Sequence, residues 1–251
     1  MTIPFEEATS IGRPFIDLGE EVATALLLTI EGGWSIARRQ SQVTPDATEV
    51  AITECLREGM REALNTSDLP WGRGMIIAPG SESKSRLGLL RPDGLTDIPV
   101  YVISVFLSSG SHDPHAIIEC KRIAESSADL VREYVVEGID RFRTAKYAAD
   151  HRIGFMVGYV IAGSANGAVA RVNGYLEKNK RSSEQLSTAG LLASNGVWFS
   201  RHPRPDTRSP VEIHHTMATV AENPVAASTT SAKNGRAQRG QVTGPSDAAG
   251  A

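Results

Sequence analysis

The sequence predicts an α/β protein whose 251 residues build one main hydrophobic core. Its composition, 41% hydrophobic and 22% charged, is typical of a globular chain. Residues 46–64 repeat apolar side chains with the 3.6-residue period of a helix. Apolar runs of strand length, flanked by proline and glycine, occur between residues 74 and 107 and again at 154–162. Helices and strands therefore alternate along the chain, which is the pattern of this class.

The first two elements are predicted to be helices. Residues 15–30 form an apolar helical segment that Gly32 and Gly33 should end. A second helix should begin after Asp46 and continue through Leu64, with Glu49 in its first turn. We interpret residues 1–45 as an N-terminal helical segment packed on the core, and residues 46–218 as the main domain.

Strands follow, and two of them should form a hairpin. Residues 74–78, 87–90 and 98–107 are predicted strands, separated by turns at Pro79-Gly80 and at Pro92-Asp93-Gly94. A polar segment, residues 108–114, then leads into the apolar run HAIIECKRIA at 115–124. We expect this run to pair with the preceding strand.

The second half continues the alternation. Ser126 and Asp129 have the spacing of a capping box, which predicts a helix running to about Ala148. Residues 154–162 predict a buried strand, 165–178 a helix, and 196–202 with 211–217 a final strand pair. After Thr219 large apolar side chains are almost absent, so residues 219–251 are expected to form a disordered tail.

Charge and cysteine content narrow the function classes. The net charge of −3 predicts no broadly cationic surface, although a local basic groove can still bind nucleic acid. The two cysteines have no disulfide or zinc spacing, which favours a reducing compartment. The most apolar early stretch, residues 22–30, is too short to cross a bilayer and lacks the features of a signal peptide. We expect a cytoplasmic protein with no membrane partner.

The run HAIIECKRIA places opposite charges inside an apolar strand. Side chains alternate along a strand, so Ile117, Glu119 and Lys121 share one face. Burying one such charge alone costs several kcal/mol, so the two must neutralise each other, be hydrated in a cleft or bind an ion. Asp97 stands at the start of the neighbouring strand, which would bring two carboxylates together beside a lysine. Oxygen ligands of this kind suit Mg²⁺.

Asp97 followed by Glu119-Cys120-Lys121 resembles the motif of the PD-(D/E)XK nuclease superfamily. The resemblance covers residues 46–162, and Asp93 is an alternative first acid that lies in a predicted turn. The resemblance implies a restriction-endonuclease-like core, with a mixed central β-sheet flanked by helices. It also implies an endonuclease that uses Mg²⁺ or Mn²⁺ to hydrolyse phosphodiester bonds, leaving a 5′-phosphate and a 3′-hydroxyl.

The resemblance also assigns roles to residues. Asp97, Glu119 and the backbone carbonyl of Cys120 would hold the metal ion. Lys121 would act beside the nucleophile, and burial and the ion would lower the pKa of its ammonium. Glu49 matches a helix glutamate that often joins the metal site in this family, but a helix-capping role explains it equally well.

Other interpretations stay open at this stage. Glu119 and Lys121 can be a salt bridge at a strand end. Arg141 and Lys146, on the helix after the motif, can contact nucleic-acid phosphates or form a solvated face. Histidines beside Ser200 and at 214–215 on the last two strands are expected to have structural partners.

Two functions from different classes are compatible with these residues. The first is a metal-dependent nuclease acting on DNA, in restriction, a mobile element or anti-phage defence. The second is a catalytically inactive module that keeps the nuclease fold for nucleic-acid binding or protein assembly. By fold analogy, a homodimer or a partner protein of a defence complex would select the target.

Overall fold

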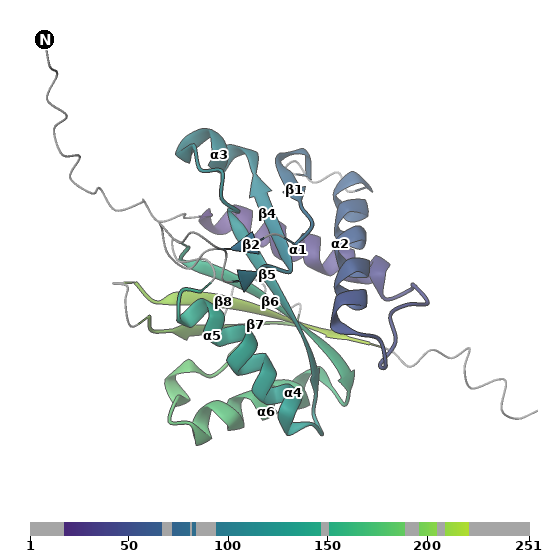
Figure 1. Ribbon diagram of the computed structural model, residues 1–251, viewed down its shortest axis with the longest axis vertical. Coiled ribbons are helices and arrows are strands. Elements are labelled where there is room, and N and C mark those ends of the chain that lie inside the picture. Colours follow the sequence, from purple (N-terminus) through teal and green to yellow (C-terminus); the bar gives the residue numbers. More distant parts are fainter. Residues whose placement is uncertain are drawn as a thin grey trace, which may run out of the picture. The chain divides into compact units, whose positions relative to one another are not determined.

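A mixed six-stranded sheet lies at the centre of the protein (Figure 1). The computed structural model describes residues 18–66, 72–80, 82–83, 94–146, 151–188, 196–204 and 209–220. The strand order is β1 (Met75–Ile77), β4 (Ile98–Val102), β5 (Ala116–Ala124), β6 (Ile153–Ala162), β8 (Val211–Thr219) and β7 (Val197–His202). The pairs β1–β4, β4–β5 and β7–β8 are antiparallel, whereas β5–β6 and β6–β8 are parallel. The predicted α/β class with a mixed sheet flanked by helices is therefore confirmed.

Helices cover both faces of this sheet. On one face lie α1 (Gly19–Ala37) and α2 (Glu49–Thr66), and on the other lie α4 (Ala128–Glu133), α5 (Asp140–Arg143) and α6 (Ala165–Lys178). Because side chains alternate along a strand, Ile118 of β5 contributes to the first core and Ile117 to the second. Several short elements are also present: η1 (Gly72–Gly74), a small sheet of β2 (Glu82–Ser83) and β3 (Gly94–Leu95), α3 (Ile103–Ser109) and η3 (Ser182–Glu184).

The first helix does not end at its glycines. It continues to Ala37, because Gly33 and Gly59 form the crossing point of α1 and α2 rather than a helix end. A Cβ on Gly59 would lie 2.3 Å from the carbonyl oxygen of Gly33. The prediction that Gly32 and Gly33 end this helix is wrong, since these residues allow close packing inside it.

The predicted hairpin is present, but its first strand is shorter than expected. Strand β4 pairs with β5 from Ile98 opposite Ile118, and it ends at Val102 where its pairing with β1 also ends. The apolar residues that follow form α3, none of whose residues is buried. The strand was predicted to reach residue 107 because residues 103–107 are largely apolar, but β4 has no described strand pairing beyond Val102.

The helix after the motif is also shorter than predicted. Its N-cap is Ser127, whose hydroxyl accepts a hydrogen bond from the Leu130 amide, and not Ser126. A π-helical turn, η2 (Tyr134–Ile139), joins α4 to α5, and α5 ends at Arg143. Ala145 has a φ of 57°, a left-handed conformation that is incompatible with a continuing helix.

The bounds of the elements in the second half agree closely with the prediction. Helix α6 has the predicted bounds, and β6, β7 and β8 differ from prediction by one or two residues at an end. The predicted strand at 87–90, the turn residues Pro92 and Asp93, and residues 221–251 of the predicted tail lie outside the described residues. Among the described residues, no helix is both long enough and apolar enough to cross a membrane.

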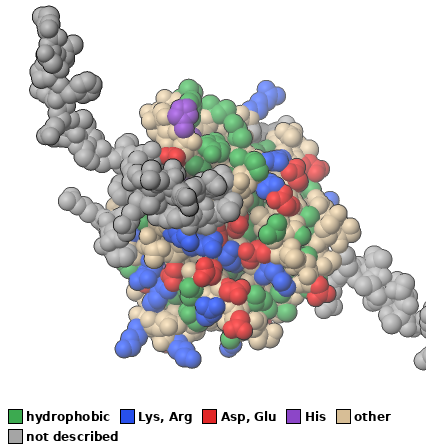
Figure 2. Space-filling view, in the orientation of Figure 1, with side chains coloured by type: hydrophobic (Ala, Val, Ile, Leu, Met, Phe, Trp, Pro, Cys, Tyr) green, Lys and Arg blue, Asp and Glu red, His purple; other side chains and the backbone are tan. Residues whose placement is uncertain are grey.

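Acidic and basic side chains are mixed on the molecular face shown in Figure 2. Red and blue groups lie side by side there instead of separating into one broad basic surface. This distribution agrees with the net charge of −3. Any nucleic-acid contact on this face would therefore depend on individual basic residues.

Candidate active site

The candidate site lies where β4 begins beside a β5 strand that continues further. The last described pair of this ladder joins Ile98 to Ile118, so the next residues of β5 extend past the start of β4. Strand β5 still pairs with β6 at Cys120, but side chains take the place of β4 and bind the backbone groups of this residue. Its N–H donates to Asp97 Oδ2 at 2.7 Å, and its carbonyl accepts from Lys121 Nζ at 2.8 Å.

Glu119 and Lys121 lie together on the face of β5 that the alternation predicts. Glu119 is fully buried, and its Oε1 is 2.9 Å from the ammonium of Lys121. Asp97 Oδ2 lies 3.9 Å from the same ammonium. The structure thus brings both predicted acids and the predicted lysine to one point of the sheet.

Glu49 reaches this point from the first turn of α2. Its Oε1 accepts a hydrogen bond from Lys121 Nζ at 2.8 Å, and its Oε2 accepts one from the backbone N–H of Arg122 at 3.0 Å. The helix cap comes instead from Thr48, whose hydroxyl accepts from the Ala51 amide at 3.3 Å. Both oxygens of Glu49 are therefore directed to β5, which favours the site interpretation over the capping one.

Arg141 belongs to the site from the opposite face of the sheet. Its Nη1 donates to Glu119 Oε1 at 2.8 Å, and its Nη2 lies 3.4 Å from Glu137. The sequence left Arg141 as either a phosphate contact or part of a solvated face, and the structure shows it bound to the buried glutamate. The other predicted phosphate contact, Lys146, lies half-buried beyond the end of α5.

The helix that carries Arg141 comes very close to β5 and β6. A Cβ added to Gly138 would lie 2.4 Å from Met156 Cε and 3.4 Å from Lys121 Cγ. Gly138 therefore allows the close approach that brings Arg141 within reach of Glu119. The absence of a side chain at this position was the only sequence signal for that contact.

The charge balance at the site depends on the protonation of Glu119. Burial, together with the charge of Asp97, raises the pKa of Glu119 to about 8, although Lys121 and Arg141 oppose this effect. Burial also raises the pKa of Asp97. With Glu119 protonated, the carboxylates of Asp97 and Glu49 face the two cations Lys121 and Arg141, and the site has an excess of negative charge only when Glu119 is ionised.

The pKa of Lys121 is shifted in the direction opposite to the one expected. Burial by itself would lower the pKa of its ammonium, but the carboxylates of Glu119, Asp97 and Glu49 outweigh burial and raise it. The ammonium is therefore protonated near neutral pH. In this arrangement it acts as a positive charge and a hydrogen-bond donor.

The oxygen atoms at the site have the chemistry that a magnesium ion requires. Among the described residues no group of three or more His, Cys, Asp or Glu side chains is arranged to hold a metal ion. Nevertheless, Glu119 Oε2 is buried and has no hydrogen-bond partner in the described part of the chain. An unpartnered buried carboxylate oxygen is costly, and a hard cation would satisfy it. With Asp97 and the Cys120 carbonyl nearby, the donor set fits Mg²⁺ or Mn²⁺.

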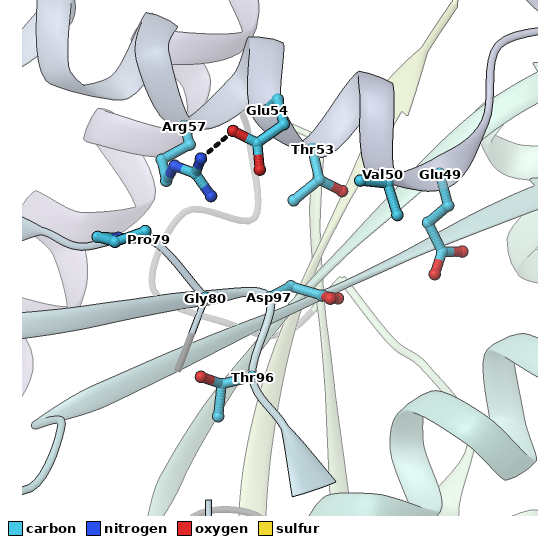
Figure 3. Close-up of a pocket in the computed structure, with 9 residues that line it drawn as sticks. All are labelled: Glu49, Val50, Thr53, Glu54, Arg57, Pro79, Gly80, Thr96 and Asp97. Atoms are coloured by element: carbon cyan, nitrogen blue, oxygen red, sulfur yellow. Dashed lines mark hydrogen bonds and ion pairs between the residues drawn. The ribbon is translucent and has the colours of Figure 1, made fainter. Parts of the chain in front are cut away.

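An open cleft of about 430 Å³ borders the site. One wall is the face of α2 from Glu49 to Arg57, and the other is formed by Pro79, Gly80, Thr96 and Asp97. Figure 3 shows Glu49 and Arg57 at the two ends of the helical wall, with Asp97 between them on the opposite side. Two of the candidate site acids therefore line a space that is accessible to a ligand.

A second polar cluster is buried between β7, β8 and the π-helical turn. Hydrogen bonds of 2.5–2.8 Å link Glu184 to His202, His202 to Ser200, Ser200 to His215, and His215 to Tyr134. Ser200 is 1% exposed and does not line the cleft. The expectation of structural partners for these histidines agrees with this arrangement.

Comparisons with protein-family models, curated proteins and solved structures give no match to this chain. The functional argument therefore depends on the geometry of the site.

Proposed function

We propose that this protein is a metal-dependent nuclease of the PD-(D/E)XK type that hydrolyses phosphodiester bonds, with DNA as its substrate. The observation that supports this proposal most strongly is the meeting of Asp97, Glu119 and Lys121 beside an open cleft. The buried, unpartnered Oε2 of Glu119 adds a position for a cation among the described residues.

The chain order around the site supports a restriction-endonuclease-like core. Helix α2 precedes three antiparallel strands, β1, β4 and β5, and the helical segment α4–α5 then leads to β6, which is parallel to β5. This is the order of helix, strands, helix and strand that the motif implies. Glu119 and Lys121 lie on β5 of this unit, and Asp97 directly precedes β4.

Asp97, Glu119 and the carbonyl of Cys120 would hold Mg²⁺ or Mn²⁺, and Glu49 would join them directly or through water. When bound, such an ion lowers the pKa of a coordinated water and offsets negative charge on a phosphate. Because Oε1 of Glu119 already binds Lys121 and Arg141, Oε2 is the oxygen that remains for the ion.

Lys121 and Arg141 have separate tasks in this proposal. The ammonium of Lys121 lies within 4 Å of both acids, so it would donate to a phosphate oxygen and stabilise charge that develops there. Arg141 would act as a positioning residue, because its guanidinium orients the carboxylate of Glu119. A setting in restriction or anti-phage defence, with a second copy or a partner protein selecting the target, belongs to the same proposal.

The test is a cleavage assay on the purified full chain. Plasmid, linear duplex, single-stranded DNA and RNA are each incubated with Mg²⁺, Mn²⁺ or EDTA. We expect metal-dependent cleavage of DNA that Asp97→Asn, Glu119→Gln and Lys121→Ala each reduce by at least 100-fold, the scale of losing one charge-stabilising group. The exposed Asp129→Asn and Lys178→Ala serve as controls of equal charge change and should cut normally. Cleavage that survives all three site substitutions would contradict the proposal.

One observation favours a second candidate, the inactive module. Lys121 already places a cation among the three carboxylates, so the ion pairs can stabilise the sheet without a metal. This alternative predicts no turnover with any substrate. It also predicts that metal does not change the thermal midpoint of unfolding, whereas an ion bound at Glu119 and Asp97 would raise it.

A further inference from the structure

Arg57 lies at the end of the cleft opposite Glu49, on the same face of α2. Residues 49, 53 and 57 are spaced four apart, so they follow one stripe of the helix and all three line the cleft. Arg57 is 9% exposed, which is unusual for a residue bordering an open space. In Figure 3 its guanidinium is directed towards the cleft.

The guanidinium of Arg57 is only partly satisfied. One nitrogen, Nη2, is bound to Glu54, whose side chain is half-exposed. The Nε of Arg57 is buried and has no hydrogen-bond partner among the described residues. Leaving a buried charged donor unpaired costs free energy, and a guanidinium has the fork of donors that binds two oxygens of a phosphate.

We infer that this end of the cleft is a phosphate-binding subsite, in which Arg57 holds a backbone phosphate of the nucleic-acid strand away from the cleavage point. The inference rests on the proposed function, and it names a contact that positions the strand rather than one that reacts with it. Phosphate contacts of this kind set the register of a nucleic acid on a protein.

The position of the subsite follows from the helix. Eight residues separate Glu49 from Arg57, which corresponds to about 12 Å along the helix axis. Asp97 lies between Glu49 and Arg57 in Figure 3, so this length is an upper limit for the distance from the cleavage point. With a rise of about 3.4 Å per nucleotide in a duplex strand, the bound phosphate lies within roughly four nucleotides of the scissile one. Between them Val50, 69% exposed, offers an apolar surface to a sugar or a base.

Glu54 provides a competing anion at this subsite. A phosphate that reaches Arg57 must approach a carboxylate already paired with the same guanidinium. Removing that carboxylate should therefore strengthen binding. A pair with a purely structural role predicts the opposite, since either substitution would then only reduce stability.

The experiment measures binding of duplex oligonucleotides, each carrying one neutral methylphosphonate linkage at a different position around the cleavage point. Wild-type protein is compared with Arg57→Gln, Glu54→Gln and the exposed control Arg171→Gln, with Ca²⁺ in place of Mg²⁺. We expect one linkage, within about four nucleotides of the cut, at which neutralisation weakens wild-type binding about tenfold but does not change the affinity of Arg57→Gln. Arg57→Gln should also reduce the slope of log K against log salt by about one, and Glu54→Gln should bind more tightly than wild type.

The outcomes separate the subsite from the nuclease proposal. Suppose that wild-type protein cuts DNA, but neutralising any one linkage weakens the binding of Arg57→Gln as much as that of wild type, or Arg57→Gln binds DNA as Arg171→Gln does. The subsite proposal is then wrong and the nuclease proposal stands. If the linkage-specific loss appears without any cleavage, the subsite stands and the catalytic proposal fails. Absence of both binding and cleavage contradicts both.

Discussion

Glu119 holds a carboxylate at a position that excludes solvent, and three separate parts of the chain meet around it. Lys121 and Arg141 bind its Oε1 from β5 and α5, and Glu49 reaches the same lysine from α2. Lys121 and Arg141 are both far from Glu49 in the sequence, and Lys121 is 72 residues away. The site therefore forms only when the fold brings these distant segments together.

Thr48 and Glu49 are adjacent, but the structure gives them different tasks. Thr48→Ala removes the N-cap of α2 and should reduce stability by about 1 kcal/mol, with little effect on cleavage. Glu49→Gln keeps the cap and removes a charge beside Lys121, so it should reduce the cleavage rate about 10- to 100-fold, with little change in stability. Urea unfolding and a cleavage assay on both variants test this separation. If Glu49→Gln lowers stability as much as Thr48→Ala and leaves cleavage intact, Glu49 is only a structural residue.

Asp97, Glu119 and Lys121 could be predicted from the sequence, because strand alternation and the pairing of two consecutive strands bring them together. The sequence could not place Arg141, because that contact depends on where a π-helical turn rotates the helix. It also could not distinguish Asp46 from Thr48 as the cap, since both are good N-cap residues two positions apart.

At the scale of elements, the crossing of α1 and α2 decides how the first wall of the cleft is held. The two helices touch through backbone atoms at Gly33 and Gly59. An added methyl group at Gly59 has no flexible neighbour to displace, because the atom it meets is a backbone oxygen. This contact fixes the position of α2, and with it the positions of Glu49 and Arg57.

Gly59→Ala should therefore destabilise the protein by about 1–3 kcal/mol, the usual cost of overpacking, even though alanine favours helices. The matched control is Gly174→Ala in α6, where nothing lies within 4 Å of the new Cβ. That substitution should stabilise by roughly 0.5–1 kcal/mol. Chemical unfolding of both variants measures the contrast. Equal effects at the two positions would show that the crossing is less tight than described.

Element bounds were predictable where burial and periodicity agree, as in α6 and β6. They were not predictable where an apolar segment is exposed. Residues 103–109 look like a continuation of β4, yet Leu107 is 76% exposed and the segment is helical. An apolar run indicates a strand only if another strand pairs with it, and that partner is not visible in the run itself.

For the whole molecule, buried histidines link stability to pH. Burial lowers the pKa of His214 to about 4, and burial with the charge of Arg204 lowers that of His151 to about 4. The pKa values of His202 and His215 are also lowered, chiefly by burial. Each of these histidines is neutral in the folded protein and would bind a proton more readily once unfolded, where its pKa is about 6.5.

The contribution of these histidines to stability should therefore be complete above pH 6.5 and fall as the pH decreases from 6.5 towards 4, by at most about 1.4 kcal/mol per pH unit for each histidine. Glu119 acts in the opposite direction, because its raised pKa makes stability fall as the pH rises from 4.5 towards about 8. Since several histidines oppose this one carboxyl, the net slope should still be positive. Urea midpoints between pH 7.5 and 4.5 measure this slope. His214→Phe, which keeps an aromatic ring between Phe155 and Phe199, should flatten it, while the exposed His112→Gln should not. A wild-type protein whose midpoint is constant over this range would contradict the assignment.

The alignment of Ile98 with Ile118 has a consequence for how this protein can tolerate changes in chain length. Because successive side chains of a strand point to opposite faces, removing Ile98 or Pro99 would turn Asp97 away from its neighbours while leaving every functional amino acid in the chain. Deletions and insertions at this junction should therefore be more harmful than most substitutions around it. Counting residues between the aspartate and the E-x-K triplet is thus as informative about this protein as identifying them.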